Sequence, residues 1–229
     1  MTAHGKDLAL RARMELTLAS AIRKFSPLRR HFVLAADVSN LAEAPSRAVF
    51  TRIGEVEIDE ALDLSEETED ERCLMQHRLN CGHWCVAGRI DGELAFYAWV
   101  MFGEMEIGAR VVSVPDAYAY SYKVFTARRF RRQGLASAYF AFLKHELSKN
   151  ERVLTSVSSN PYEVSRRPAT RRHLLTTVAS DNVASRGLHE RCGFSSFGTV
   201  WTVRGTDRAL TTNSVALLVE RTTAARAAA

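Results

Sequence analysis

The stretch that decides the fold is "RRFRRQGLASAYFAFLKHEL", residues 128–147, in which four of the first five residues are arginine. After Gly134 the apolar residues recur at spacings of three and four, which predicts a helix. A turn that opens a helix gathers unpaired backbone N–H groups and the positive end of the helix dipole, and such a point binds phosphate. Gly134 and the small Ala136 allow a close approach to the backbone. We therefore expect a phosphate-binding turn at residues 131–136.

A second motif follows in "VASDNVASRGLHERCGF", residues 178–194. It reads as a strand end, a helix from about Val183 to Arg191, and a glycine stop at Gly193. The two motifs in this order resemble the GNAT superfamily of acyl-CoA-dependent acyltransferases. The resemblance covers about residues 83–220.

The resemblance implies an α/β (α+β) fold with a central mixed, mostly antiparallel sheet splayed in a V and flanked by helices. We expect a GNAT-like domain over residues 31–221 and a frayed tail at 222–229. Residues 1–30 scatter Arg and Lys among apolar residues at helical spacing, which predicts a basic helical extension. This extension is either a solvated helix packed by one face, or an element that contacts a partner, a membrane surface or a second subunit of a homodimer.

The resemblance also implies acetyl-CoA, or another acyl-CoA, as co-substrate, with no metal. The pantetheine arm would bind like an added strand beside the main chain of Val124 and Thr126. Asn182 would hydrogen-bond the pantetheine from the other side of the split. A strand N–H between Lys123 and Phe125 would polarise the acyl carbonyl. The residues expected to hold the pyrophosphate are Arg131, Arg132, Gln133, Gly134, Ala136 and Ser137.

The expected catalytic residues are His189 and Glu104. The family commonly has a Tyr at the position of His189, where it protonates the departing thiolate. A histidine there would act as an imidazolium acid or through its neutral N–H, or it would only pack on the cofactor. Glu104 and Glu106 follow a predicted strand and are the candidates for the general base. Three tyrosines that share one strand face would line the acceptor pocket: Tyr118, Tyr120 and Tyr122.

The rest of the chain supplies further elements. Alternation predicts strands at 31–38, 47–53, 118–126, 173–180, 194–204 and 214–220. Asp91-Gly92 predicts a two-residue hairpin between strands within residues 83–102. The acidic stretch 55–82 predicts one or two helices that end at Gly82. Residues 150–172 contain two prolines and many arginines, so we expect an insertion or a mobile loop.

The composition of the chain limits the class of protein and the kind of ligand that we expect. The 229 residues are 46% apolar, carry a net charge of +5 and have a pI near 9.2, which weakly favours a phosphate-bearing ligand. Four cysteines, no signal peptide and no long apolar run predict a reduced, cytoplasmic protein without structural disulfides or a membrane span.

Two other kinds of site receive less support from the sequence. Five residues between 73 and 85 are Cys or His, but their spacing lacks the paired cysteines typical of zinc sites, so we expect no metal. The "ARRFRR" run could bind nucleic acid, with Phe130 stacking on a base. The pyrophosphate site accounts for this charge, and we therefore expect no nucleic-acid partner.

These observations together predict an N-acetyltransferase that moves the acetyl group of acetyl-CoA to a primary amine by direct attack. The acceptor would be a small molecule or a protein amine. The alternative is a module that binds acyl-CoA without turnover and acts as a sensor or scaffold.

Overall fold

The computed structural model describes residues 28–54, 58–65, 69–107, 110–149, 172–203, 209–216 and 218–219. The predicted extension up to residue 27, the predicted loop at 150–171 and the tail lie outside these residues. The strands are β1 (Leu28–Asp37), β2 (Val49–Ile53), β3 (Trp84–Ile90), β4 (Glu93–Phe102), β5 (Glu104–Ile107), β6 (Arg110–Ser113), β7 (Tyr118–Thr126), β8 (His173–Ala179), β9 (Ser195–Val203) and β10 (Ala209–Thr211). The helices are α2 (Ile58–Ser65), α3 (Glu69–Asn80), α4 (Leu135–Lys149) and α5 (Val183–Arg191), with short 3-10 turns η1 (Val38–Asn40) and η3 (Arg128–Phe130).

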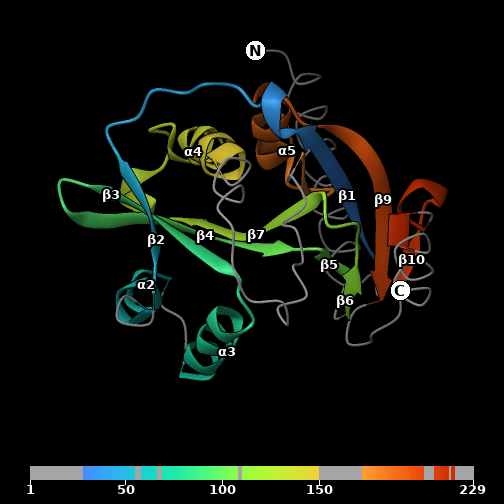
Figure 1. The fold of residues 1–229 in the computed structure, drawn as a ribbon, viewed down its shortest axis with the longest axis horizontal. Helices are drawn as coiled ribbons and strands as arrows, with labels where there is room; N and C mark the ends of the chain where they lie inside the picture. Colours follow the sequence, from blue (N-terminus) through green and yellow to red (C-terminus); the bar gives the residue numbers. More distant parts are fainter. Residues whose placement is uncertain are drawn as a thin grey trace, which may run out of the picture.

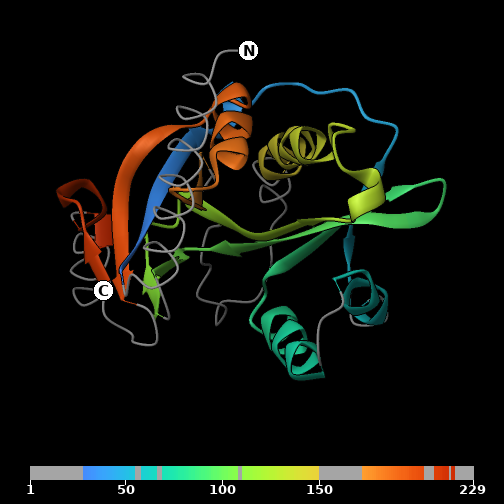
Figure 2. The same ribbon diagram turned by 180° about the vertical axis from the view of Figure 1, so that it is seen from behind.

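Eight strands form one sheet in the order β10-β9-β1-β8-β7-β4-β3-β2, and β5 and β6 form a separate hairpin. Every neighbouring pair in the large sheet is antiparallel except β7 and β8, which are parallel. Helices α4 and α5 cover one face and α2 and α3 cover the other, as both ribbon views show (Figures 1 and 2). The predicted fold class, a mixed and mostly antiparallel sheet flanked by helices, is confirmed.

The two faces of the sheet carry separate apolar cores. One core joins Met75 of α3 and Leu62 of α2 to β4 and β7 through Trp99 and Tyr120. The other core packs α4 and α5 against the opposite face of the sheet. Its large side chains include Phe96, Tyr139, Phe140, Leu143 and Phe194. Alternation along β4 and β7 explains this division, because successive side chains point to opposite faces.

The sheet splits where β7 and β8 meet. Pairing between them runs only from Tyr118–His173 to Ser121–Thr176. Of the next five residues of β7, Tyr122, Phe125 and Thr126 are paired with β4, and none is paired with β8. The edge of β7 that faces β8 is therefore open beyond Ser121, which is the predicted V.

A bulge marks the open half of β7. Tyr122 pairs with Trp99 and Phe125 pairs with Tyr97, so Lys123 and Val124 together oppose the single residue between them on β4. Lys123 has φ 45°, in the left-handed region that side chains rarely adopt. Two residues against one, with the first left-handed, define a β-bulge that turns the strand and removes main-chain groups from the ladder.

The structure corrects four details of the sequence prediction. β1 begins at Leu28, three residues before the predicted strand at 31–38, and lies between β8 and β9. The predicted strand at 214–220 is wrong, since residues 213–216 are helical and bury Val215. The last strand is instead β10. The β5–β6 hairpin was not predicted, although Met105 and Ile107 alternate with Glu104 and Glu106, as in a strand.

Candidate active site

The predicted phosphate-binding turn forms the wall of a cavity of about 350 Å³ at the start of α4. Gly134 has φ 77°, and a Cβ placed there would meet no atom within 4 Å, so the turn both requires glycine and faces open space. No acidic residue lies in the first turn of α4. The unpaired N–H groups of this turn therefore keep their positive end toward the cavity. The lining residues are Thr126, Phe130, Arg131, Arg132, Gly134, Leu135, Ala136, Ser137, Leu188 and Arg191.

Two of the four arginines in the 128–132 run line this cavity, namely Arg131 and Arg132. Arg131 donates from Nε to the Thr126 carbonyl oxygen at 3.1 Å, which fixes it to the end of β7. Arg129 instead forms an ion pair with the glutamate that begins β4. Arg191 of α5 lines the cavity too, and no motif in the sequence singled it out. Three guanidinium groups thus line one cavity at a helix N-terminus, an arrangement suited to a pyrophosphate.

The remaining predicted cofactor residues have different positions. Gln133 donates to the Arg129 carbonyl at 3.2 Å, so its side chain closes the turn. Val124 lies on the open half of β7 and is 39% exposed. Asn182 is the N-cap of α5, and its side-chain oxygen accepts the N–H of Ser185 at 3.0 Å. The capping bond gives Asn182 a structural role that the sequence prediction had not assigned.

His189 is a core residue of α5, only 5% exposed. Its ring packs between Phe140 and Phe194, with centroids 5.1 Å from each. Nδ1 lies 2.7 Å from the Ser185 carbonyl oxygen, which can only accept, so Nδ1 carries the proton of the neutral ring. Nε2 is buried without a hydrogen-bond partner among the described residues.

The environment of His189 argues against the predicted role as general acid. Burial lowers the pKa of the imidazole, although the bond to the Ser185 carbonyl opposes this. The neutral ring has one proton, and the main chain already uses it. The sequence could place a residue on this helix but could not show that its side chain turns into the aromatic core.

A second cavity of about 290 Å³ lies on the face that carries α2 and α3. It lies where the pairing of β7 with β8 ends, because Tyr120 of β7 is still paired with β8 and Thr177 follows the last paired residue of β8. The β5–β6 hairpin closes one side through Glu106 and Ile107. The residues contributed by β1 and β9 are Arg29, His31, Val200 and Thr202.

Glu106, and not Glu104, lines this second cavity. Burial raises the pKa of the Glu106 carboxyl above its ordinary value, while the charges of Arg78 and Lys123 oppose the rise. Glu104 begins β5, pairs with Ser113 and lines neither of the two cavities. A carboxyl with a raised pKa in a cleft is a candidate general base, and of the two glutamates that the sequence suggested, Glu106 has this environment.

Of the three tyrosines predicted to line the acceptor pocket, Tyr120 does so. Its hydroxyl lies 2.7 Å from Thr177 Oγ1. Tyr122 stacks beside it at 5.8 Å, and its hydroxyl lies 2.7 Å from His83 Nδ1. Tyr118 lies at the other end of β7 with its ring 4.8 Å from that of His173. Burial raises the pKa of both Tyr120 and Tyr122, so both hydroxyls stay protonated.

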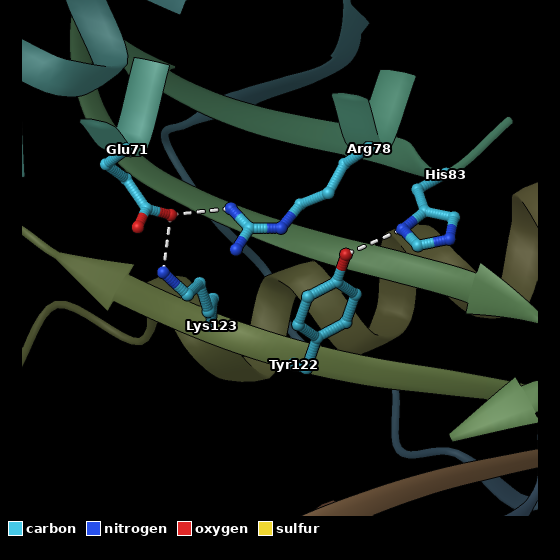
Figure 3. Close-up of polar contacts among 5 residues, drawn as sticks. All are labelled: Glu71, Arg78, His83, Tyr122 and Lys123. Carbon is cyan, nitrogen blue, oxygen red and sulfur yellow. Dashed lines mark hydrogen bonds and ion pairs between the residues drawn. The ribbon is translucent and has the colours of Figure 1, made fainter. Parts of the chain in front are cut away.

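A network of charges connects α3 to the bulge (Figure 3). Glu71 Oε1 accepts hydrogen bonds from Arg78, at 2.6 Å, and from Lys123. The Glu71 and Arg78 side chains are only 11% and 12% exposed. The Arg78 guanidinium also lies over the rings of Trp99 and Tyr122, at 5.4 and 5.8 Å. The sequence pattern did not suggest this network, because its members are far apart in the chain.

The Cys and His residues between 73 and 85 do not converge. Cys85 is buried, Cys73 and Cys81 are exposed, and His83 bonds Tyr122. Within the ranges that the structure describes, no three side chains of the Cys, His, Asp and Glu types are grouped for a metal ion. No helix in those ranges is long and apolar enough to cross a membrane.

Comparison with known proteins identifies the fold. No family model and no curated protein matches the sequence. A GNAT-family acetyltransferase from Colwellia psychrerythraea superposes with a TM-score of 0.52 at 14% identity, over 73% of this chain and 53% of that one. A tandem GNAT protein from the clavulanic acid biosynthesis pathway gives 0.50 at 15%, over 82% and 55%. A functionally unknown conserved protein from Staphylococcus epidermidis ATCC 12228 gives 0.51 at 10%, over 86% and 77%.

This chain therefore has the GNAT fold, as the paired motifs in its sequence predicted. It spans just over half the length of the two GNAT chains, at 53% and 55%.

Proposed function

We propose that this protein is a GNAT-superfamily N-acyltransferase that uses acyl-CoA, with acetyl-CoA as the simplest donor and a primary amine as acceptor. One observation carries the proposal: the arginine-lined helix N-terminus and the open edge of β7 meet at Thr126. A pyrophosphate binds at a positively charged helix N-terminus, and an extended arm that carries amide groups pairs with an open strand edge. Few ligands combine the two, and coenzyme A is one.

The chain's own residues fit this ligand. The N–H groups at the start of α4, with Arg131, Arg132 and Arg191, would hold the pyrophosphate. The open main chain at Val124 and Thr126 would pair with the pantetheine amides. When bound, acyl-CoA supplies an activated thioester carbonyl.

The bulge and the second cavity supply the remaining chemistry. The left-handed conformation at Lys123 takes nearby N–H groups out of the ladder, where one can polarise a carbonyl. Glu106 lines the second cavity and would accept the proton of the incoming ammonium, so that the amine lone pair attacks the carbonyl carbon. The carbon–sulfur bond then breaks, the attacking nitrogen loses its second proton, and the thiolate takes up that proton and leaves as the thiol.

Titration calorimetry of acetyl-CoA tests the binding half of the proposal. We expect micromolar binding to the unaltered protein and a loss of about tenfold or more in Arg132→Gln, since charge-assisted bonds to phosphate are lost. Arg128→Gln is the matched control, because Arg128 belongs to the same run but does not line the cavity. No binding to the folded, unaltered protein would refute the proposal.

Thiol release with a panel of amines tests the catalytic half. Acceptor-dependent release of coenzyme A is expected for an acyltransferase. Tight acetyl-CoA binding with no release on any amine, and no slow hydrolysis, would instead favour a sensor or scaffold that only binds the ligand.

A further inference from the structure

The second cavity carries two opposite charges that do not neutralise each other. Glu106 and Arg29 both line it. The charges that act on the Glu106 carboxyl are those of Arg78, Lys123 and Glu71, and Arg29 is not among them. In the part of the chain that the structure describes, the Arg29 guanidinium has no ion-pair partner. The cavity thus has an acidic and a basic residue that form no ion pair with each other among the described residues.

The two charges belong to different walls of the cavity. Arg29 lies on β1, where it pairs in register with Thr202 of β9. Burial, and after it the charge of Arg29, lowers the pKa of His31, two residues along the strand. Glu106 comes from β5, and its charge adds to the burial that raises the pKa of Tyr120 on β7. In the sheet, β1 and β9 lie on the β8 side of the split, and β7 lies on the other side. A ligand in the cavity therefore meets a negative wall at one end and a positive wall at the other.

This inference rests on the proposed function, and it names the acceptor. We infer that the acceptor is a free amino acid, whose amine faces Glu106 and whose carboxylate is held by Arg29. Guanidinium binds carboxylate through two parallel hydrogen bonds, which fixes the orientation of the ligand as well as its charge. The amine then lies on the β7 side, next to the bulge that faces the acyl group.

The size and charge of the cavity exclude the main competitors. Its volume of about 290 Å³ suits a compact ligand and is too small to enclose an aminoglycoside. A polyamine would place a second cation against the guanidinium of Arg29, and like charges repel. An amine without an anionic group would make no charge-assisted contact with Arg29, an exposed residue that lines the cavity.

The test compares each free amino acid with its own amide. An amino-acid amide keeps the amine and the side chain but replaces the carboxylate with a neutral group. With acetyl-CoA as donor, and the twenty standard amino acids and their amides as acceptors, thiol release gives kcat/KM for each pair. We expect at least one free amino acid to exceed its amide by about tenfold or more, the usual effect of one lost charge-assisted contact.

Two neighbouring arginines supply the variant and its control. Arg29→Gln should abolish the preference for the free acid, and Arg29→Lys should restore part of it. Arg30→Gln removes the same charge one residue along β1, where the side chain points to the opposite face and lies over Phe32 and Trp201. Arg30→Gln should keep the preference. All three variants should bind acetyl-CoA as the unaltered protein does.

The outcomes separate the inference from the proposed function. Failure of the unaltered protein to bind acetyl-CoA refutes the proposed function and the inference with it. Binding with amides acylated as fast as free acids, or with Arg29→Gln as selective as the unaltered protein, refutes the inference alone. Binding without turnover of any free amino acid also refutes the inference, while turnover of another amine leaves the acyltransferase function standing.

Discussion

The hydroxyl of Tyr120 lies 2.7 Å from Oγ1 of Thr177, and this contact joins β7 to β8 just beyond their last paired residues. On the opposite face of the sheet, Ser121 Oγ lies 2.8 Å from the hydroxyl of Tyr139 on α4. Two hydroxyl pairs thus hold the apex of the V, one on each face. The first pair joins β7 to β8 and the second joins β7 to α4, so side chains as well as main-chain bonds hold β7 where the split begins.

The Ser121–Tyr139 pair should contribute measurably to stability, because both side chains are completely buried. Ser121→Ala or Tyr139→Phe leaves one hydroxyl without a partner, which costs about 1–3 kcal/mol of unfolding free energy. The double variant should cost less than the sum of the two, since no orphan hydroxyl remains. Urea unfolding of the four proteins measures this coupling. Additive losses would show that the pair is not a unit.

The sequence predicted the parts of the fold that depend on local pattern. The left-handed turn at Gly134, the hairpin at Asp91-Gly92 and the limits of α5 follow from glycine chemistry and helical spacing. The position of β1 between β8 and β9 could not be predicted, because strand partners are set by burial across the whole sheet. The residues at 214–220 fit either a short strand or a helical turn. In the structure, residues 213–216 and 218–219 are helical.

On the face of the sheet that carries α2 and α3, the network of Glu71, Arg78 and Lys123 should make the largest pH-dependent contribution to the unfolding free energy. Burial raises the pKa of the Glu71 carboxyl, but hydrogen bonds from Lys123 and Arg78 outweigh burial and hold the pKa below its ordinary value. A depressed pKa gives stability that is complete above the ordinary value of 4.5 and is lost as the pH falls through the folded value. The unfolding free energy should therefore drop steeply below pH 4.5.

Glu71→Gln removes the acceptor of two cations and should destabilise the protein by about 3 kcal/mol at neutral pH. The acid-side loss should become shallower in this variant. Glu60→Gln is the control, because the Glu60–Arg89 pair is more exposed, and a surface pair is worth about 1 kcal/mol or less. Equal losses for the two variants, measured by urea unfolding at neutral and acid pH, would contradict the role given to the buried network.

The Glu106 carboxylate should lower the stability of the fold and raise the rate of the reaction. Its raised pKa means that folding disfavours the carboxylate, so the stability cost appears as the pH rises from the ordinary value toward the folded value. Glu106→Gln should therefore unfold no more easily than the unaltered protein at neutral pH. It should lose about 10²–10⁴-fold in kcat/KM, and the rise of kcat/KM with pH on the acid side should disappear. Glu104→Gln, on the same strand, should change neither quantity, and a loss of activity there would return the base to Glu104.

The sequence located the cavity at the start of α4 better than the second cavity. A helix N-terminus with glycine and arginine is a local feature, and it was found from residues 131–137 alone. The second cavity is lined by four strands that are far apart in the sequence and by the β5–β6 hairpin, so Arg29 and Glu106 line one cavity only in the folded chain. The resemblance to the GNAT superfamily predicted His189 as a catalytic residue, but a matching position in the sequence does not fix the direction of a side chain.

His189→Phe separates a catalytic role from a packing role. A phenylalanine ring can occupy the site between Phe140 and Phe194 and leaves no unpartnered nitrogen, so the unfolding free energy should change by less than about 1 kcal/mol at neutral pH. Burial lowers the pKa of His189, so the unfolded chain binds the proton more tightly below the ordinary value of 6.5. The stability that the neutral ring contributes is therefore lost as the pH falls below 6.5, and His189→Phe should remove this loss. Turnover should stay unchanged, whereas a large fall in kcat with intact stability and acetyl-CoA binding would show that His189 takes part in proton transfer.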